Sequence, residues 1–306
     1  MADKSPMLAE RKSIHLWPAK LRFPVFALPK LDGIRCVCAS ALAVSRSFIG
    51  IANDHVRESI SRPDLEGLDG ELIVGSPSAE NVYNKTCAVN GNKVKVPEFS
   101  WQVFDDFSGS PELPYSVRQH RLRERLLEFS MADLYPFIRY VEPTLLETWA
   151  DLERYEEGIL GDGFEGVITR SPEGLYKFGR STAKEQAMLK LKRFTDGEAE
   201  IIGFEELMHN TNPNIKDAFG HAKRSKAQDG LVSGGTLGKM QVRDIETGVE
   251  FQIGMFKGLT SPQKQEIWNE RDSHLGSIVK YSHFAHGAID KPRHSKFLGF
   301  RARTDM

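Results

Sequence analysis

Residues 30–35 read K-L-D-G-I-R and combine a primary amine, a tight turn and a guanidinium within one short segment. A lysine amine can attack phosphorus once it is neutral, and an arginine can hold a phosphate or a ribose. Free lysine has a pKa of about 10.4, so a nucleophilic Lys30 needs burial or neighbouring cations that lower this value. Without further signals, the segment is equally compatible with a β-turn that carries a solvated lysine.

Two later motifs place a glutamate directly after a turn and before an apolar strand. Residues 69–71 read D-G-E, and residues 162–166 read D-G-F-E-G. Their glutamates, Glu71 and Glu165, could bind a ribose hydroxyl and a divalent metal ion, respectively. Taken singly, each motif is more often a solvated turn.

A fourth motif, L-K-L-K at residues 189–192, alternates apolar and cationic side chains. Side chains two positions apart on a β-strand point to the same face, so Lys190 and Lys192 are predicted to share one face. Paired cations suit a triphosphate, although an ordinary solvated strand face is a common alternative.

The hydrophobic pattern predicts short strands and a few helices that would position these motifs. In the first two thirds of the chain, strands are predicted over residues 22–28, 34–44, 68–74, 99–107, 165–169 and 187–192. Helices are predicted over residues 52–60, with Asn53 or Asp54 as the N-cap, and over residues 116–127 and 150–160.

From residue 198 onward the chain reads as short alternating segments separated by Gly-rich turns. Strands are predicted over residues 198–207, 239–244, 249–253, 278–284 and 297–301, with one helix over residues 261–271. This pattern is typical of a small antiparallel barrel of the OB type. We therefore predict an α+β chain of two domains, residues 1–195 and residues 196–306.

The composition is that of an ordinary globular chain, with 40% hydrophobic and 27% charged residues among 306. The formal net charge of −1 argues neither for nor against nucleic acid, because phosphate binding needs only a local basic face. No apolar run approaches the roughly 20 residues that span a bilayer. The charged N-terminus is not a signal peptide, and three cysteines form no disulfide framework, so we expect a cytoplasmic protein.

The order of the motifs is more informative than any one of them. The lysine motif, Ser45-Arg46, D-G-E, an aromatic strand, D-G-x-E-G and K-x-K together resemble the nucleotidyltransferase motif series of ATP-dependent DNA ligases and mRNA capping enzymes. The similarity covers most of the chain. Residues 292–301 resemble the last, OB-domain motif of compact bacteriophage DNA ligases. The resemblance implies an adenylation domain of antiparallel sheets with flanking helices, followed by an OB-fold barrel.

The resemblance also implies roles for the residues at matching positions. Lys30 would carry AMP through a phosphoramidate bond. Arg35 and Arg46 would contact the nucleotide sugar and phosphate, and later the nick phosphate. Glu71 would hold the ribose, and Phe104 would stack on adenine.

The remaining matches concern the phosphates and the metal. Glu165 would help to place a divalent metal ion, with Mg²⁺ as the default for phosphate substrates. Lys190 and Lys192 would neutralise the α-phosphate and the charge that develops on it. Arg293 and Arg301 would orient the leaving pyrophosphate when the OB domain closes.

Two positions depart from the family pattern. Many family members have an acidic residue two positions before the nucleophile, where this chain has Leu28, so the adenine contact there would rest more on backbone groups. Compact phage relatives often have a tryptophan just before the K-x-K pair, where this chain has Leu189. Both changes concern base recognition rather than the chemistry.

A polar stretch over residues 209–235 interrupts the predicted barrel and contains a basic run. We predict that Lys223, Arg224 and Lys226 contact the DNA backbone across from the catalytic domain. A solvated flexible loop is the alternative, because charge runs are often no more than that.

The implied function is that of an ATP-dependent DNA ligase that seals nicks in duplex DNA through a lysyl-AMP and a DNA-adenylate, acting as a monomer in the cytoplasm of a bacterial host. An RNA ligase or a capping guanylyltransferase is the closest rival, and the choice of base would distinguish them. NAD is not the expected AMP donor, because the ligases that use NAD are longer chains with additional domains. A non-catalytic OB protein that binds nucleic acid is a rival of another class, but plain binding would not require the set of Lys30, Glu71, Glu165, Lys190 and Lys192.

Overall fold

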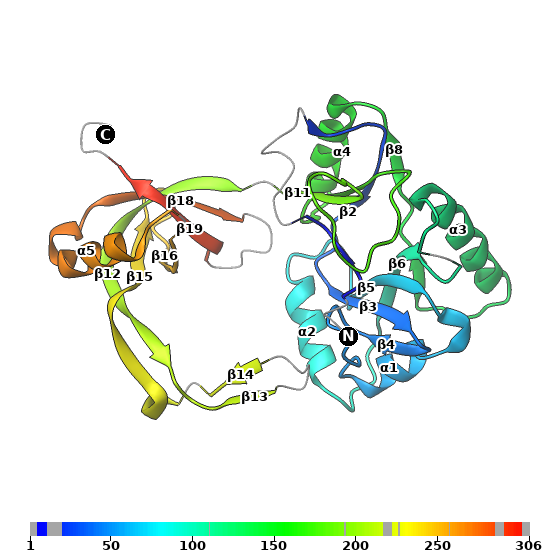
Figure 1. The fold of residues 1–306 in the computed structure, drawn as a ribbon, viewed down its shortest axis with the longest axis horizontal. Coiled ribbons are helices and arrows are strands. Elements are labelled where there is room, and N and C mark those ends of the chain that lie inside the picture. Colours follow the sequence, from blue (N-terminus) through cyan, green and yellow to red (C-terminus); the bar gives the residue numbers. More distant parts are fainter. Residues whose placement is uncertain are drawn as a thin grey trace. The chain divides into compact units, whose positions relative to one another are not determined.

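The computed structural model describes residues 5–10, 20–109, 111–192, 194–216, 222–225, 227–256, 258–284 and 291–301, with only the backbone of residues 215, 216, 222, 223 and 284. The chain divides into two compact units, Met1–Arg193 and Phe194–Met306. The ribbon of each unit can be followed in Figure 1. The predicted domain boundary, between residues 195 and 196, falls inside the first strand of the second unit, β12 (Thr195–Asn210).

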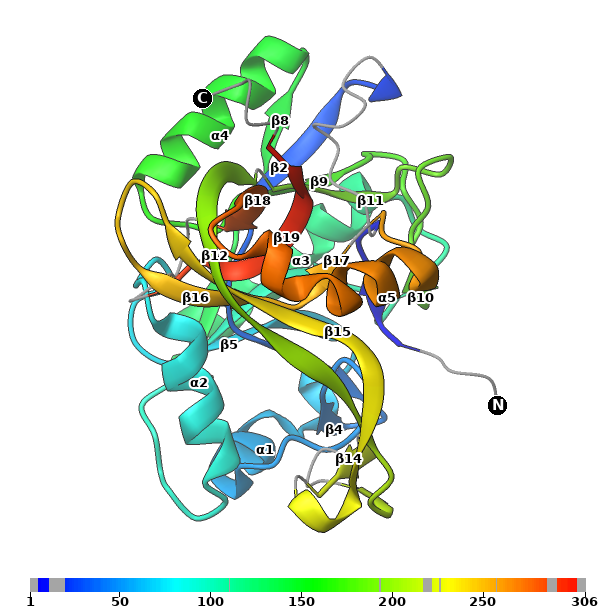
Figure 2. The same cartoon turned by 90° about the vertical axis from the view of Figure 1, so that its left-hand side faces the viewer.

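The first unit is built around two sheets, which Figures 1 and 2 show from two sides. The larger sheet has the strand order β4 (Leu42–Val44), β3 (Ile34–Ala39), β5 (Leu68–Ile73), β6 (Ser100–Asp106) and β7 (Ile138–Tyr140). The smaller has the order β11 (Met188–Leu191), β9 (Val167–Arg170), β2 (Val25–Pro29) and β8 (Thr144–Leu146). Neighbouring strands in both sheets are antiparallel except β6 and β7, and the short pair β1 (Met7–Leu8) and β10 (Gly179–Arg180) is also parallel.

One face of the larger sheet forms a hydrophobic core against helices. Cys36, Leu72 and Trp101 lie on this face and pack with residues of α1 (Asp54–Ile60) and α3 (Tyr115–Met131). Because successive side chains of a strand alternate between faces, the opposite face carries Arg35 and Glu71. These two residues are direct partners in the β3–β5 register.

The smaller sheet follows the same design. Ala27, Val167 and Leu191 form a core with Leu152 of α4 (Trp149–Gly161). The opposite face carries Leu28, which pairs with Ile168 of β9. In each sheet, therefore, one face is covered by helices and the other is left for the polar motifs.

The K-L-D-G-I-R segment joins the two sheets, because β2 ends at Pro29 and β3 begins at Ile34. Gly33 is required in this turn, since a Cβ at that position would lie 2.2 Å from the backbone oxygen of Leu72. The prediction of a single strand over residues 34–44 is wrong. The chain reverses at Ser40 and Ala41, which adopt φ values of 55° and 54°, and β3 and β4 form a hairpin.

The predicted helices of the first unit are confirmed. The side chain of Asn53 accepts a hydrogen bond from the Val56 N–H at 3.0 Å and caps α1, as predicted. α3 and α4 are longer than predicted, and Thr148 caps the N-terminus of α4. The sequence pattern did not reveal α2 (Val82–Gly91), the 3₁₀ turn Pro63–Leu65, or the strands β1, β7, β8 and β10.

The second unit is a six-stranded sheet that curls into a small barrel of the predicted OB type. Its strand order is β16 (Glu250–Ile253), β15 (Leu231–Asp244), β12, β18 (Ile278–Phe284), β19 (Arg293–Phe300) and β17 (Met255–Phe256). α5 (Ser261–Asn269) begins with a capping box between Thr260 and Gln263. 3₁₀ turns cover Gln228–Gly230 and Arg271–His274.

The described residues of the polar stretch over residues 209–235 include paired strands. β12 and β15 extend into it and still pair at Asn210 and Leu231. Between them, β13 (Asn214–Lys216) and β14 (Ala222–Arg224) form a short antiparallel hairpin. Among the helices that the structure describes, none is long and apolar enough to cross a membrane.

Candidate active site

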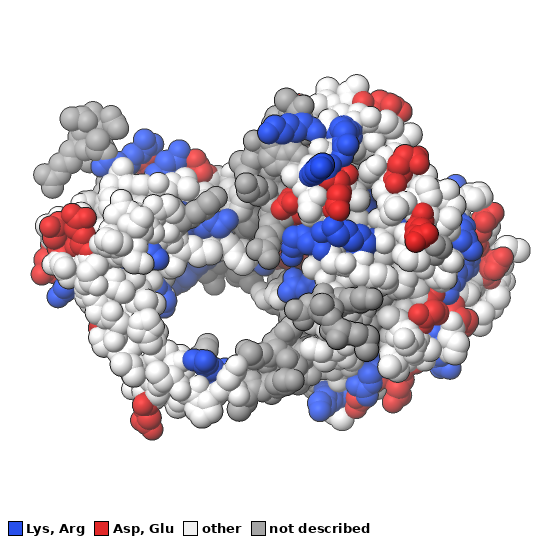
Figure 3. All heavy atoms as spheres, in the orientation of Figure 1, with Lys and Arg blue, Asp and Glu red and all other residues white. Residues whose placement is uncertain are grey.

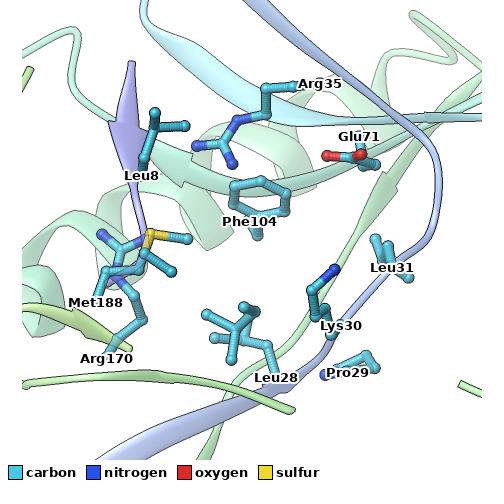
Figure 4. Close-up of a pocket in the computed structure, with 12 residues that line it drawn as sticks. Leu8, Leu28, Pro29, Lys30, Leu31, Arg35, Glu71, Phe104, Arg170 and Met188 are labelled. Carbon is cyan, nitrogen blue, oxygen red and sulfur yellow. The ribbon is translucent and has the colours of Figure 1, made fainter. Parts of the chain in front are cut away.

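A cavity in the first unit gathers residues from both sheets (Figure 4). Five of the predicted site residues line it: Leu28, Lys30, Arg35, Glu71 and Phe104. The other lining residues are Leu8, Ala9, Pro29, Leu31, Ile168, Arg170 and Met188. The cavity thus joins the side chains that the helix-free faces of β2, β9 and β11 present to those of β3, β5 and β6.

Lys30 lies at the end of β2, where its backbone N–H donates to the oxygen of Gly166 at 2.8 Å. Its ammonium nitrogen donates to Oε2 of Glu165, and Lys192 donates to Oε1 of the same carboxylate. The Glu165 side chain is only 6% exposed. The predicted nucleophile Lys30, the predicted phosphate-binding Lys192 and the predicted metal-binding Glu165 therefore form one ion-paired cluster.

Burial and the neighbouring charges shift the pKa values of the groups in this cluster. Burial favours the neutral form of Glu165, but the ammonium groups of Lys30 and Lys192 hold its pKa at about 2. Burial lowers the pKa of Lys192 to about 8, with Glu165 opposing the shift and Lys30 adding to it. Burial and the charge of Lys30 also lower the pKa of Lys190.

The predicted common face of Lys190 and Lys192 agrees with the packing. Leu189 and Leu191 are fully buried in the core beneath the sheet, so the alternating lysines belong to the other face. Lys190 pairs in register with Ile168, which lines the cavity.

Arg35 is fixed by the carboxylate of Asp69, which was not among the predicted site residues. Its Nε donates to Oδ1 of Asp69 at 2.5 Å, and its Nη2 donates to Oδ2 at 2.6 Å. The hydroxyl of Tyr176 also donates to Oδ2 of Asp69, at 2.7 Å. Held in this way, the Arg35 guanidinium carbon lies 4.6 Å from the ring centroid of Phe104. Asp69 belongs to the D-G-E motif, but the motif does not indicate that Asp69 binds Arg35.

Glu71 faces the same cavity from the neighbouring strand. Burial raises its pKa to about 7, and the charges of Asp69 and Asp32 add to this shift while Arg35 and Lys30 oppose it. A carboxyl group in this state can accept a hydrogen bond from a hydroxyl when it is ionised, or donate one when it is not.

A buried ion network lies behind Phe104. Asp105 is fully buried, and its Oδ1 accepts from Nε of Arg118 at 2.8 Å. Arg170 donates to Oδ2 of the same carboxylate. These two guanidinium groups hold the pKa of Asp105 below its usual value against the effect of burial. The backbone oxygen of Phe104 accepts a hydrogen bond from the side-chain amide of Gln119 at 2.8 Å. This bond and the ion pairs of the neighbouring Asp105 hold the strand that carries the Phe104 ring.

Some predicted residues lie elsewhere. Arg46 is exposed in the turn after β4 and does not line the cavity. Arg293 and Arg301 belong to the second unit, where Arg301 donates to Oε1 of Glu198 at 2.6 Å. Figure 3 shows the Lys and Arg side chains of the described residues in blue on one face of the molecule.

The three cations of the predicted DNA contact also belong to the second unit. Arg224 is exposed on β14, and its Nη1 donates to the backbone oxygen of Asn210. Lys223 pairs with Ile215 through the backbone of the hairpin, while its side chain lies outside the described part of the chain. Lys226 lies entirely outside the described residues.

Two facing sheets that present lysines, arginines and carboxylates around a cavity, followed by an OB barrel, define the class of nucleotidyltransferase–OB proteins. No model of a known protein family matches the chain. A solved structure of Chlorella virus DNA ligase-adenylate is 30% identical, with a TM-score of 0.55, and the match covers 99% of this chain and 99% of that one. A structure of a Lig E DNA ligase, 21% identical with a TM-score of 0.67, shares the fold over 98% of this chain and 100% of its own.

Among curated proteins, a DNA ligase of African swine fever virus is 26% identical over 191 residues. That match covers 58% of this chain and 43% of the relative, so the chain matches less than half the length of these curated relatives. Because it matches the Chlorella virus enzyme from end to end at 30% identity, the chain belongs to the DNA ligase family. The resemblance to ligases predicted from the motif series is thereby confirmed.

Proposed function

We propose that the protein is an ATP-dependent DNA ligase that seals nicks between a 5′-phosphate and a 3′-hydroxyl in duplex DNA. The observation that carries the proposal is the position of Lys30, whose amine meets Glu165 at a cavity that also presents Glu71 and Phe104. One pocket therefore offers a nucleophile and groups suited to a nucleoside.

The cavity suits adenosine in its shape and chemistry. A base can stack on Phe104, whose ring is flanked by the Arg35 guanidinium. Leu28 and Ile168 supply an apolar surface from the other sheet. Glu71 can accept a hydrogen bond from a ribose hydroxyl.

In the first step, Lys30 attacks the α-phosphorus of ATP, forms a P–N bond and expels pyrophosphate. Negative charge is spread over the phosphate oxygens in such reactions, so positioned cations supply much of the catalysis. Lys192 is held close to the nucleophile through their common partner Glu165, and Lys190 follows on the same strand face. Both lysines are thus proposed to neutralise the α-phosphate.

Mg²⁺ is the metal that this chemistry implies, and the site fits it only as a partner of the substrate. Among the described residues, no group of three or more His, Cys, Asp or Glu side chains could hold a metal ion. Glu165 is ionised and can contribute one carboxylate, and Mg²⁺ in proteins commonly uses one or two carboxylates together with substrate phosphates and water. The ion would supply neutralisation of the phosphate charge when bound.

In the second step AMP passes from Lys30 to the 5′-phosphate of the nick, and in the third the 3′-hydroxyl displaces AMP. Arg35 and Arg46 are proposed to contact the nucleotide and then the nick phosphate. Arg293 and Arg301 are proposed to orient pyrophosphate in the first step. For Arg301 this requires the guanidinium to leave Glu198, its partner in the second unit.

The hairpin of β13 and β14 is proposed to carry the DNA contact, with the protein acting as a monomer on one nick. Replacing Lys223, Arg224 and Lys226 with alanine should weaken binding to nicked DNA and flatten the dependence of log K on log salt, because each phosphate contact adds about 0.9 to that slope. An unchanged salt titration would remove the hairpin from the DNA contact and leave the ligase proposal intact.

The reaction is tested by supplying purified protein with ATP, GTP or NAD and Mg²⁺, followed by a nicked duplex labelled at the 5′-phosphate. We expect an adduct of AMP from ATP alone, its discharge by nicked DNA, and a sealed strand on a denaturing gel. An adduct from GTP would indicate capping chemistry. No adduct from any donor would leave a nucleic-acid-binding OB protein.

A further inference from the structure

Arg170 is a buried arginine at the wall of the nucleotide cavity. Only 1% of the residue is exposed, yet it is one of the side chains that line the cavity. Figure 4 shows Arg170, Leu8 and Met188 on one side of Phe104, and Lys30 and Glu71 on the other. Arg170 is therefore remote from the end of the cavity where phosphate and ribose are proposed to bind.

At least one N–H donor of Arg170 is left without a partner among the described residues. Its Nη2 donates to Asp105 and lies 3.4 Å from the sulfur of Met7, and its guanidinium carbon lies 4.2 Å above the ring of Tyr115. Its buried Nε has no hydrogen-bond partner among the residues that the structure describes. Buried donors are almost always paired, so an unpaired N–H in a cavity wall points to an acceptor that the protein itself does not supply.

Arg118 provides an internal comparison. It binds the same carboxylate of Asp105, but through Nε at 2.8 Å and Nη2 at 3.1 Å. Its Nη1 donates to the backbone oxygens of Leu113 and Gly174, and Arg118 does not line the cavity. Binding Asp105 thus does not require an arginine to leave its Nε unpaired, and the unpaired donor belongs to the arginine that faces the cavity.

We propose that Nε of Arg170 donates a hydrogen bond to a ring nitrogen of adenine, on the edge of the base that points away from the ribose. This inference rests on the proposed function, in which Glu71 holds the ribose and Lys30 meets the α-phosphate. The edge away from the ribose carries two acceptors, N1 and N7. Leu28 supplies no polar side chain to the base, so a hydrogen bond from Arg170 would add a side-chain contact to those that backbone groups make.

The choice between N1 and N7 as the acceptor decides which nucleotides the protein would select. Guanine also has an acceptor at N7, but its N1 carries a hydrogen and cannot accept. A bond from Arg170 to N1 would therefore select ATP over GTP, whereas a bond to N7 would select purines over pyrimidines.

The test measures equilibrium binding of ATP, 1-deaza-ATP and 7-deaza-ATP to the whole protein in the presence of a metal chelator. Each analogue replaces one ring nitrogen by C–H. We expect one of them to bind the wild-type protein about 10- to 100-fold more weakly than ATP, which is the effect of losing a hydrogen bond to a charged donor. Arg170→Lys keeps a cation beside Asp105 but lacks Nε, and it should bind ATP and that analogue equally.

Arg118→Lys is the matched control, because it perturbs the same ion network without touching the cavity. It should keep the wild-type discrimination between ATP and the analogue, and thermal unfolding of both variants reports any loss of fold. Equal binding of all three nucleotides to the wild-type protein would overturn the proposal without any variant. Retained discrimination in Arg170→Lys would overturn it as well.

The outcome is separable from that of the proposed function. Discrimination that depends on Arg170, in a protein that forms no adduct with ATP and Mg²⁺, would support the base contact and reject the ligase reaction. An adduct without any discrimination would do the opposite.

Discussion

Glu71→Gln should change how the stability of the protein depends on pH. Glu71 lies in β5 beside Arg35, and burial raises its pKa to about 7 from an ordinary value of 4.5. Below pH 4.5, the folded and unfolded states both bind the proton, so the raised pKa of Glu71 does not lower the stability of the protein there. Between pH 4.5 and 7, the unfolded chain loses the proton that the folded protein keeps, so stability falls as pH rises and the loss is complete above about pH 7.

The size of the effect follows from the shift. A pKa change of one unit corresponds to about 1.4 kcal/mol, so the shift from 4.5 to about 7 gives about 3.5 kcal/mol at most. Glutamine does not titrate. The free energy of unfolding of the variant, minus that of the wild type, should therefore rise by about 2–3 kcal/mol between pH 5 and pH 8.5.

The assay is urea unfolding of both proteins at several pH values between these limits. Subtracting the two curves removes the contributions of all other titrating groups. Glu157→Gln, at an exposed position on α4, controls for the loss of a negative charge. A difference between Glu71→Gln and wild type that stays flat across this range would refute the account of the Glu71 environment.

Asp105→Asn removes the charge that two buried arginines share, and it should lower the free energy of unfolding by about 3–5 kcal/mol in denaturant titrations; a loss below about 1 kcal/mol would contradict the role of this network. Gly33→Ala forces a Cβ to within 2.2 Å of the Leu72 oxygen, and it should cost about 1–3 kcal/mol and slow adduct formation with ATP. Gly158→Ala, in α4 with nothing within 4 Å of the new methyl group, should instead stabilise by up to about 1 kcal/mol, and equal effects of the two changes would refute the steric explanation.

The elements that carry the motifs could be predicted because their signals are local. Alternation predicts the face on which Lys190 and Lys192 lie, and the Asn53 cap and the helix that follows it are within one turn of each other. The β3–β4 hairpin could not be predicted in this way. Its turn is made by Ser40 and Ala41, neither of which is a residue that typically favours positive φ.

The partners within the site were beyond sequence reasoning for a different reason. Asp69 and Tyr176 are 107 positions apart, and nothing local indicates that the two meet to hold Arg35. The N-terminal segment has a charged and polar sequence, yet Leu8 lines the cavity because β1 pairs with β10. Long-range pairing decides these contacts, whereas the motifs reveal only which types of residue are available.

The most direct measurement of the central claim is the intact mass of the protein after incubation with ATP and Mg²⁺, followed by mapping of the modified peptide. We predict a gain of one AMP, carried on Lys30, absent from Lys30→Ala and retained in the control Lys20→Ala. Lys20 is exposed and does not line the cavity, so its loss should leave the adduct unchanged. An adduct on another residue, or one that persists in Lys30→Ala, would contradict the assignment of Lys30 as the nucleophile.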